Sequence, residues 1–159
     1  MNISKIEVNS ERWLNLKNFR GEVWKKIESD PTEGEYYISN YGRLKRMPFF
    51  GGRYHFPEMI FRVHLSHKTG YYKVRVANRM RYIHRLVAEA FVYNAFGRKY
   101  VDHRNGNKLD NRARNLKWVT AKQNANNPIT IWERQVRYGY PAKEKPKAIR
   151  TQVNLSKVI

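Results

Sequence analysis

The chain has 159 residues, with 32 Lys and Arg against 13 Asp and Glu, which gives a formal net charge of +19 at pH 7. This charge predicts a polyanionic partner, most simply nucleic acid, and the length suits one domain or a small core with an appendage. The sequence has no cysteine, which excludes disulfides and cysteine zinc sites. It also has no apolar run long enough to cross a membrane and no signal-peptide core, so an intracellular protein without a membrane partner is expected.

The first 21 residues predict one short helix. Ser10 is placed to cap it, Trp13, Leu14 and Phe19 give it an apolar side, and Gly21 would close it.

Residues 22–47 predict a strand, a turn and a basic strand. Residues 37–39 favour a strand, residues 40–42 a turn, and residues 43–46 a returning strand. We expect Arg43, Lys45 and Arg46 to project from it and lie against DNA. The alternative is a solvated edge strand whose positive charge prevents aggregation.

Residues 48–58 contain prolines and paired glycines, so they predict a connection. Apolar and polar residues then alternate over 61–65 and 72–76, and residues 80–83 complete a hairpin after a turn at 77–79. The outward residues of these strands are basic, which predicts a twisted antiparallel sheet with one cationic face: Arg62, His64, Lys73 and Arg75.

Residues 84–91 predict a helix with apolar positions at 86, 87, 90 and 91. We expect it to brace the segment that follows. His84 stands at the start of this helix, and we interpret it as structural rather than catalytic.

Residues 100–127 predict a strand, a polar loop, a second strand and a short helix, with Thr120 and Gln123 as a capping box. Asp102 and His103 end the first strand, and Asn124 lies one turn into the helix, so these side chains are placed to share a cleft. Carboxylate and amide oxygens suit Mg²⁺ or Mn²⁺. His103 is placed to act as a general base, and Asn115 to orient its imidazole.

Residues 102–124 read D-H-x-N-G-N-x-x-D-N-x-x-x-N-L-x-W-V-T-x-x-x-N. This frame resembles the HNH (ββα-metal) endonucleases. Because it ends on Asn rather than the commoner His, it is similar to the H-N-N subgroup of phage homing endonucleases. Residues 22–47 resemble the NUMOD-type module that precedes such domains, and H-R-L-V-A-x-x-F at 84–91 belongs to the same likeness.

The resemblance implies a metal-dependent endonuclease acting on double-stranded DNA. Asp102 and Asn124 would hold one Mg²⁺ or Mn²⁺ ion at the scissile phosphate and the departing 3′-oxygen. His103 would activate the attacking water, and Asn115 would hold His103 or its loop. The products implied are 5′-phosphate and 3′-hydroxyl ends, and a monomer with one motif would nick or cut strands sequentially.

The sequence as a whole predicts an α+β fold, a basic antiparallel sheet region followed by a ββα-metal motif. The expected divisions are 1–21, a DNA-binding region at 22–83, the nuclease motif at 84–127, and a basic extension at 128–159, where Pro128 halts the helix. The extension either orders on DNA or is a disordered tail. In the motif, the expected DNA-binding residues are Arg104, Lys108, Arg112 and Arg114.

Two other classes of protein stay open from the sequence alone. One is a DNA-binding protein without catalysis, either a repressor or a decayed nuclease. The other is a basic structural RNA-binding protein, which would explain the charge and the aromatic residues but not the Asp-His-Asn-Asn set.

Overall fold

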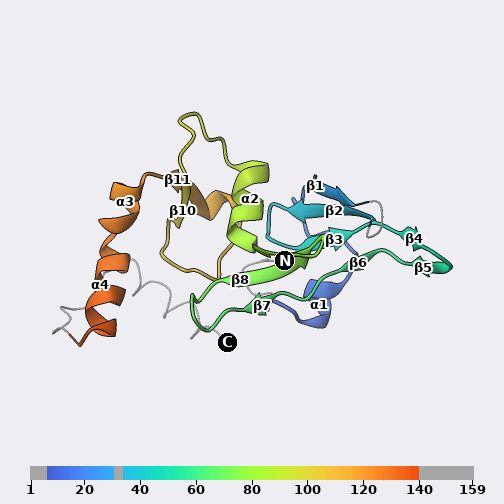
Figure 1. Ribbon diagram of the computed structural model, residues 1–159, viewed down its shortest axis with the longest axis horizontal. Helices are drawn as coiled ribbons and strands as arrows, with labels where there is room; N and C mark the ends of the chain where they lie inside the picture. Colours follow the sequence, from blue (N-terminus) through green and yellow to red (C-terminus); the bar gives the residue numbers. More distant parts are fainter. Residues whose placement is uncertain (1–6, 31–33, 140–159) are drawn as a thin grey trace.

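Helix α2 (Ile83–Phe91) lies near the centre of the molecule and packs against strands from both halves of the chain (Figure 1). The structure is a computed structural model that describes residues 7–30 and 34–139. Leu86 and Val87 are at most 1% exposed. The helix predicted over 84–91 is therefore confirmed. Its apolar side meets residues of the strands in one core: Tyr36, Ile38, Leu44, Val63, Val74, Val76, Val101 and Leu116.

An antiparallel sheet of four strands, in the order β1-β2-β3-β6, forms the N-terminal region. The strands are β1 (Trp24–Asp30), β2 (Gly34–Ser39), β3 (Leu44–Arg46) and β6 (Met59–Ile60). Gly42, in the turn between β2 and β3, has φ 86°, and a Cβ there would lie 3.0 Å from the side chain of Ile83. Glycine is thus required both by the backbone and by the helix behind it, and the predicted turn is confirmed.

Residues 48–58 differ from the expected connection. They contain a hairpin of β4 (Phe49–Gly51) and β5 (Tyr54–Phe56), which projects at one end of the molecule (Figure 1). The prediction of an irregular connection was wrong, because the two prolines flank the hairpin and do not interrupt it. Gly52, with φ 60°, supplies the first central position of a two-residue turn.

The second sheet has the order β7-β8-β9, formed by β7 (His64–Leu65), β8 (Tyr72–Val76) and β9 (Arg79–Tyr82). Ala77 and Asn78 both have positive φ, 42° and 61°, which suits the tight turn between twisted strands. Val74 and Val76 are buried while Arg75 is exposed. The predicted antiparallel sheet is confirmed, but its faces are mixed, because Arg81 pairs with Val74 and Met80 pairs with Arg75. The single cationic face stays a prediction.

The last part of the chain forms a strand pair followed by helices. Its elements are β10 (Tyr100–His103), the 3-10 helix η2 (Ala113–Asn115), β11 (Leu116–Val119), α3 (Ala121–Ala125) and α4 (Pro128–Arg137). Thr120 and Gln123 form the predicted capping box. Pro128 follows the end of α3 and is also the first residue of α4. At this position a backbone N–H would have no partner within the helix, so proline is tolerated there. The expectation for residues 140–159 lies outside the described residues.

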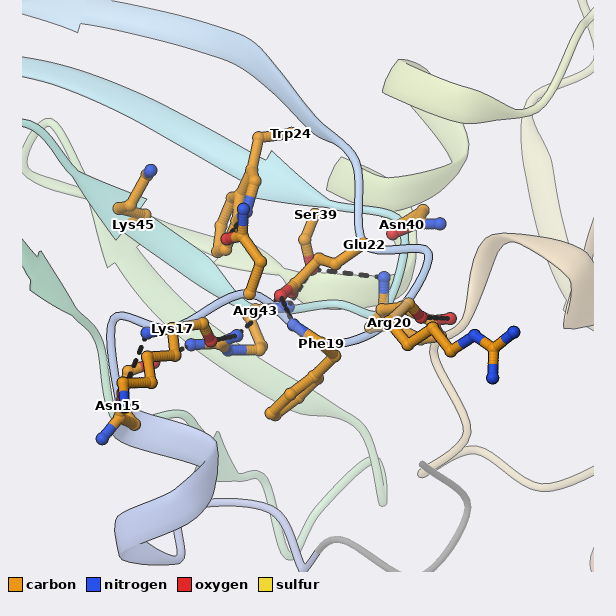
Figure 2. A network of polar contacts seen from close by, with 12 residues as sticks. Asn15, Lys17, Phe19, Arg20, Glu22, Trp24, Ser39, Asn40, Arg43 and Lys45 are labelled. Carbon is orange, nitrogen blue, oxygen red and sulfur yellow. Dashed lines mark hydrogen bonds and ion pairs between the residues drawn. The ribbon is translucent and has the colours of Figure 1, made fainter. Parts of the chain in front are cut away.

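The N-terminal helix α1 (Glu11–Leu14) is capped by Ser10 as expected, but it ends at Leu14 and not near Gly21. The chain that follows wraps around Arg43, which is 0% exposed (Figure 2). The Arg43 guanidinium lies 2.7 Å from Glu22 Oε2 and donates to the backbone oxygens of Lys17 and Asn15. Its face covers the Phe19 ring at 4.3 Å from the centroid.

The prediction that Arg43 projects towards DNA is therefore wrong. Ser39 precedes the turn and accepts the Arg43 N–H. The Arg43 side chain lies on the face of the sheet that the N-terminal segment covers, next to the rings of Phe19 and Trp24. A buried guanidinium must be paired and hydrogen-bonded, and the loop of residues 15–22 provides these partners. Arg43 fastens the N-terminal segment to the sheet.

The fold class is α+β with antiparallel sheets, as predicted. The divisions at 1–21, 22–83, 84–127 and 128–159 stay a prediction. None of the described helices has the length and apolar character needed to cross a membrane.

Candidate active site

Strands β10 and β11 place Asp102 and His103 on opposite faces. The ladder pairs Asp102 with Lys117 and His103 with Leu116. Because side chains alternate along a strand, Val101 and His103 turn into the core and are buried, while Asp102 faces outward and is only partly buried. In contrast to the prediction, the structure does not bring Asp102 and His103 into one cleft, because the two side chains lie on opposite faces of the strand.

Asp102 faces a cleft of about 920 Å³ between the strand pair and helices α3 and α4. It is the one carboxylate among the described residues that line this cleft. The cationic lining residues are Arg98, Arg104, Lys117 and Lys122. A single acid surrounded by cations makes the cleft attractive to a phosphate group.

Asp102 is held in a fixed orientation by two neighbours. Lys117 Nζ lies 3.2 Å from Asp102 Oδ2. The side-chain amide of Asn127 donates to both carboxylate oxygens, at 3.0 and 2.9 Å. The Oδ1 of Asn127 accepts from the backbone N–H of Ile129 and so caps α4. The oxygen of Asn127 is therefore committed to the helix, and its N–H₂ group to Asp102.

His103 is 3% exposed, and its imidazole Nε2 lies 3.2 Å from Asn111 Oδ1. The Asn111 amide is itself oriented, because its Nδ2 donates to the backbone oxygen of Leu109 at 3.3 Å. Asn111 therefore presents an acceptor, which assigns the proton of the neutral imidazole to Nε2. Nδ1 is left as the basic nitrogen of His103.

Aromatic neighbours surround this imidazole. The ring centroids of Tyr71 and His84 lie 5.9 and 5.5 Å from that of His103. Burial lowers the pKa of His103 against the opposing effect of its hydrogen bond to Asn111. Burial, with His103 nearby, lowers the pKa of His84 to about 3. Both imidazoles are therefore neutral at neutral pH. His84 is buried beside His103, and its interpretation as a structural residue stays a prediction.

Asn115 is 7% exposed and fixes the loop rather than the imidazole. Its Oδ1 accepts from Asn105 N at 3.0 Å, and its Nδ2 donates to Asn105 Oδ1 and to Asp110 O. Burial raises the pKa of the Asp110 carboxyl, but its hydrogen bonds with Arg112 outweigh burial and leave that pKa below its usual value. Of the two roles expected for Asn115, the contacts match that of holding the loop.

Asn124 lies in α3 and is partly buried. The described contacts of Asp102 are with Lys117 and Asn127, and Asn124 does not line the same cleft. In the part of the chain that the structure describes, the Asn124 side chain makes no hydrogen bond, although its backbone N–H bonds to Thr120 O. Its role as a metal ligand stays a prediction.

The cations predicted to contact DNA fall into distinct settings. Lys45 lies 2.9 Å from Glu58, and Arg46 stacks over the Phe49 ring at 4.7 Å. Arg112 is paired with Asp110. The others are exposed or partly buried on the surface: Arg62, Lys73, Arg75, Arg104, Lys108 and Arg114.

Sequence reasoning missed five residues that shape this site. Asn111 and Asn127 orient His103 and Asp102, while Arg98 and Lys122 supply charge to the cleft. Lys117, which forms an ion pair with Asp102, was missed as well, and the signal for it is its position opposite Asp102 once the two strands are paired. Asn111 is a position of the quoted frame, and Asn127 before Pro128 is a helix-cap signal, but neither signal indicates the contact with His103 or Asp102.

Residues 22–77 match the NUMOD4 motif, and residues 81–126 match the HNH endonuclease family. The predicted resemblance is thereby confirmed. An uncharacterized HNH endonuclease of Acanthamoeba polyphaga mimivirus is 38% identical over 131 residues, 74% of this chain and 30% of that protein. DNA endonuclease I-HmuI of Bacillus phage SP01 is 32% identical over 111 residues, 67% of this chain and 58% of the relative.

A solved structure, described as DNA binding and cleavage by the HNH homing endonuclease I-HmuI, is similar with a TM-score of 0.48 and 28% identity. The match covers 81% of this chain and 65% of that one. The chain spans 30% of the length of the two mimivirus relatives that it matches.

Proposed function

The chain belongs to the HNH endonucleases, with a NUMOD4 motif before its nuclease domain, and on this premise we propose that it hydrolyses phosphodiester bonds of double-stranded DNA. The observation that carries the proposal is one carboxylate, Asp102, set in a cleft lined by cations. The next residue, His103, is a neutral, oriented histidine whose side chain lies on the opposite face of the strand. Phosphate binding needs the cations, and hydrolysis needs the base.

In this proposal, His103 accepts a proton from water at Nδ1. Asn111 favours that reaction because it keeps the other proton on Nε2 and holds the ring plane. Burial keeps His103 neutral and thus able to accept the proton. The four cations of the cleft bind the phosphates on either side of the bond to be cut.

The donor chemistry of the site fits a hard divalent cation. No group of three or more His, Cys, Asp or Glu gathers in residues 7–30 and 34–139, so a nitrogen- or sulfur-rich metal site is not formed there. Asp102 and the amide of Asn124 would hold Mg²⁺ or Mn²⁺, with water and substrate phosphate completing the shell. Such an ion supplies charge stabilisation to the phosphate in the transition state. Asn127 is assigned to orienting Asp102, because its oxygen already caps α4.

The test is cleavage of supercoiled plasmid with Mg²⁺ and with EDTA. Asp102→Ala and His103→Gln should each abolish cleavage, since removing a general base alone typically costs ~10²–10⁴ in rate. DNA affinity should stay within a few-fold of the wild type. His67→Ala removes an exposed histidine and serves as the matched control. Cleavage at the wild-type rate by His103→Gln, with saturating Mg²⁺, would refute the assigned base.

Asn124 is tested by titrating the metal. Asn124→Ala should raise the Mg²⁺ concentration needed for cleavage. Asn127→Ala should slow cleavage with a smaller change in that concentration, because it supports Asp102 without giving an oxygen. An unchanged Mg²⁺ requirement in Asn124→Ala would remove Asn124 from the ligand set. A protein that binds duplex DNA but never cleaves it would be the non-catalytic DNA-binding alternative.

A further inference from the structure

Lys117 is the one cation of the cleft that forms an ion pair with Asp102 in the described part of the chain. Its Nζ lies 3.2 Å from Asp102 Oδ2. The ladder places the two residues directly opposite each other, so their side chains share one face of the strand pair. One of the two oxygens with which Asp102 would bind a divalent ion therefore already has a monovalent partner.

The other three cations of the cleft have different surroundings. The Arg98 guanidinium donates to a backbone oxygen of β11 at 3.3 Å and lies over the Phe96 ring, 5.0 Å from its centroid. Arg104 Nε donates to another backbone oxygen of that strand, also at 3.3 Å. Lys122 is exposed on α3 and forms no ion pair within residues 7–30 and 34–139. The position of Lys117 beside the carboxylate is thus particular to this residue.

The Lys117 side chain is able to change partners. It is 42% exposed, whereas the Asp102 side chain is 14% exposed. An ion pair with one partner so exposed contributes little stability, so breaking it costs little. A lysine ammonium on its flexible four-carbon stem pairs with a phosphate oxygen as well as with a carboxylate. A substrate phosphate in the cleft can therefore replace Asp102 as the partner of Lys117.

A divalent ion and Lys117 compete for the Asp102 carboxylate. Two cations held a few ångströms apart repel each other strongly where the effective dielectric constant is well below that of water. The Asn127 amide also contacts both carboxylate oxygens, but it carries no charge. Among the described residues, Lys117 is therefore the charged competitor at Asp102.

The simpler role for Lys117 is a structural cross-strand pair that holds β10 against β11. In that role, loss of Lys117 would leave Asp102 less well oriented and would weaken cation binding. Competition has the opposite consequence, because loss of Lys117 removes a positive charge from the ligand and strengthens cation binding. The two roles differ in the direction of one measurable change.

We propose that Lys117 exchanges partners during binding: it pairs with Asp102 in the free protein and with a phosphate oxygen of DNA in the complex. Asp102 then becomes available to a divalent ion only when the substrate is in the cleft. The inference rests on the proposed function and adds an order of binding to it. Lys117 thereby couples DNA binding to cation uptake, with no covalent step and no proton transfer of its own.

The experiment titrates the full chain with Mn²⁺ in the absence of DNA and measures free Mn²⁺ by electron paramagnetic resonance. Lys117→Met should bind Mn²⁺ about 5- to 30-fold more tightly than the wild type. Lys117→Gln, a second neutral variant, should show the same gain. Lys117→Arg keeps the charge and should bind no more tightly than the wild type.

Two controls assign the gain to the Asp102 site. Lys122→Met removes one positive charge from the same cleft without a contact to Asp102, and it should gain less than about three-fold. Asp102→Asn added to Lys117→Met should abolish the gain. The proposal is overturned by an unchanged or lower Mn²⁺ affinity in Lys117→Met, by an equal gain in Lys122→Met, or by a gain that survives Asp102→Asn.

The DNA side of the exchange is measured by anisotropy of a fluorescein-labelled duplex in EDTA over a salt series. Lys117→Met should lower the magnitude of the slope of log affinity against log salt by about 1, because one phosphate contact is lost. The variant should also cleave more slowly in single turnover at saturating Mn²⁺, although it binds the free ion more tightly. A wild-type slope would show that Lys117 does not move to the phosphate, and it would overturn the exchange.

This inference and the proposed function fail in different ways. If the wild type cleaves plasmid with Mg²⁺ and Lys117→Met shows no gain in Mn²⁺ affinity, the nuclease assignment stands and Lys117 is a structural cross-strand partner. If Lys117→Met gains Mn²⁺ affinity through Asp102 but the wild type never cleaves, the competition at Asp102 stands and the proposed function is lost.

Discussion

The orientation of His103 depends on Asn111, which lies eight positions later at the end of a polar loop. An amide oxygen fixed by a second hydrogen bond, here from Nδ2 to Leu109 O, can only accept from the imidazole. This arrangement selects one tautomer without a carboxylate partner, which would instead favour the charged ring. A neutral base with a defined free nitrogen is what proton removal from water requires.

Asn111→Ala should therefore release the ring and mix the two tautomers. We expect single-turnover cleavage to slow by about 10- to 100-fold. The ¹⁵N chemical shifts of His103 should show a protonated Nε2 in the wild type and an averaged signal in the variant. Asn105→Ala, which disturbs the same loop without contacting His103, is the control for a structural effect. Identical His103 shifts in wild type and Asn111→Ala would contradict the assignment.

His84 makes a pH-dependent contribution to stability. Its pKa is about 3 in the folded protein against 6.5 for the free side chain, so the unfolded chain binds the proton more readily between these values. Stability is fully present above pH 6.5 and falls as the pH drops towards 3, by about 1.4 kcal/mol per pH unit at most.

Urea unfolding at pH 7.5 and pH 5 measures this effect. His84→Phe keeps a buried ring but cannot titrate. The free energy of unfolding should therefore fall less from pH 7.5 to pH 5 in this variant than in the wild type, and the difference should be about 2 kcal/mol. An equal loss in both proteins would show that His84 does not titrate in this range.

The positions of the candidate site residues were predictable because their spacing is part of a motif: Asp102 and His103 at a strand end, and Asn115 before the second strand. Their roles were less predictable. Asn115 binds Asn105 and Asp110 rather than the imidazole, because loop closure brings those partners nearer. The contact between Asn127 and Asp102 joins separate elements and depends on how the short helix α3 ends, which no local pattern specifies.

At the scale of elements, β2, β3, β8, β9 and α2 followed from local patterns, whereas β1, β6, the β4–β5 hairpin and α4 did not. The β4–β5 hairpin was missed because Pro48 and Pro57 suggested a connection, although Gly52-Arg53 between aromatic runs is a hairpin turn signal. Helix α4 was missed because Pro128 was interpreted as a stop, when Asn127 before it is a good cap.

The attachment of the N-terminal segment to the sheet depends on the Arg43–Glu22 ion pair, in which both side chains are fully buried. Arg43→Met should destabilise the fold by about 3–5 kcal/mol, because it leaves the Glu22 carboxylate buried without its partner. Lys45→Met breaks a partly exposed pair and should cost less than about 1 kcal/mol. Urea denaturation measures both.

The same pair of variants separates a structural role from DNA contact. Below its unfolding transition, Arg43→Met should bind duplex DNA as the wild type does. If Arg43→Met had wild-type stability but weaker DNA binding, Arg43 would be a DNA-contacting residue, which would contradict its burial.

In the part of the chain that the structure describes, Lys and Arg residues lie on both sheets and around the cleft rather than in one loop. Binding should therefore depend strongly on salt. If roughly 6–10 phosphates are neutralised, affinity should drop about 10³–10⁵-fold between 50 and 200 mM salt. Fluorescence anisotropy against a salt series measures this. A nearly flat plot would mean that the basic surfaces do not lie along the DNA backbone.

The side chain of Asn127 touches Asp102 with one end and begins helix α4 with the other. Rotation of the Asn127 amide would break its hydrogen bonds to Asp102 and its cap of α4 together. The orientation of the Asp102 carboxylate and the start of the helix are therefore coupled. If Asp102 holds a cation, as proposed, the ion competes with the Asn127 amide for the same carboxylate oxygens, and cation binding is then coupled to the start of α4. By thermodynamic reciprocity, a partner that moves α4 would change the affinity of Asp102 for that cation by the same factor.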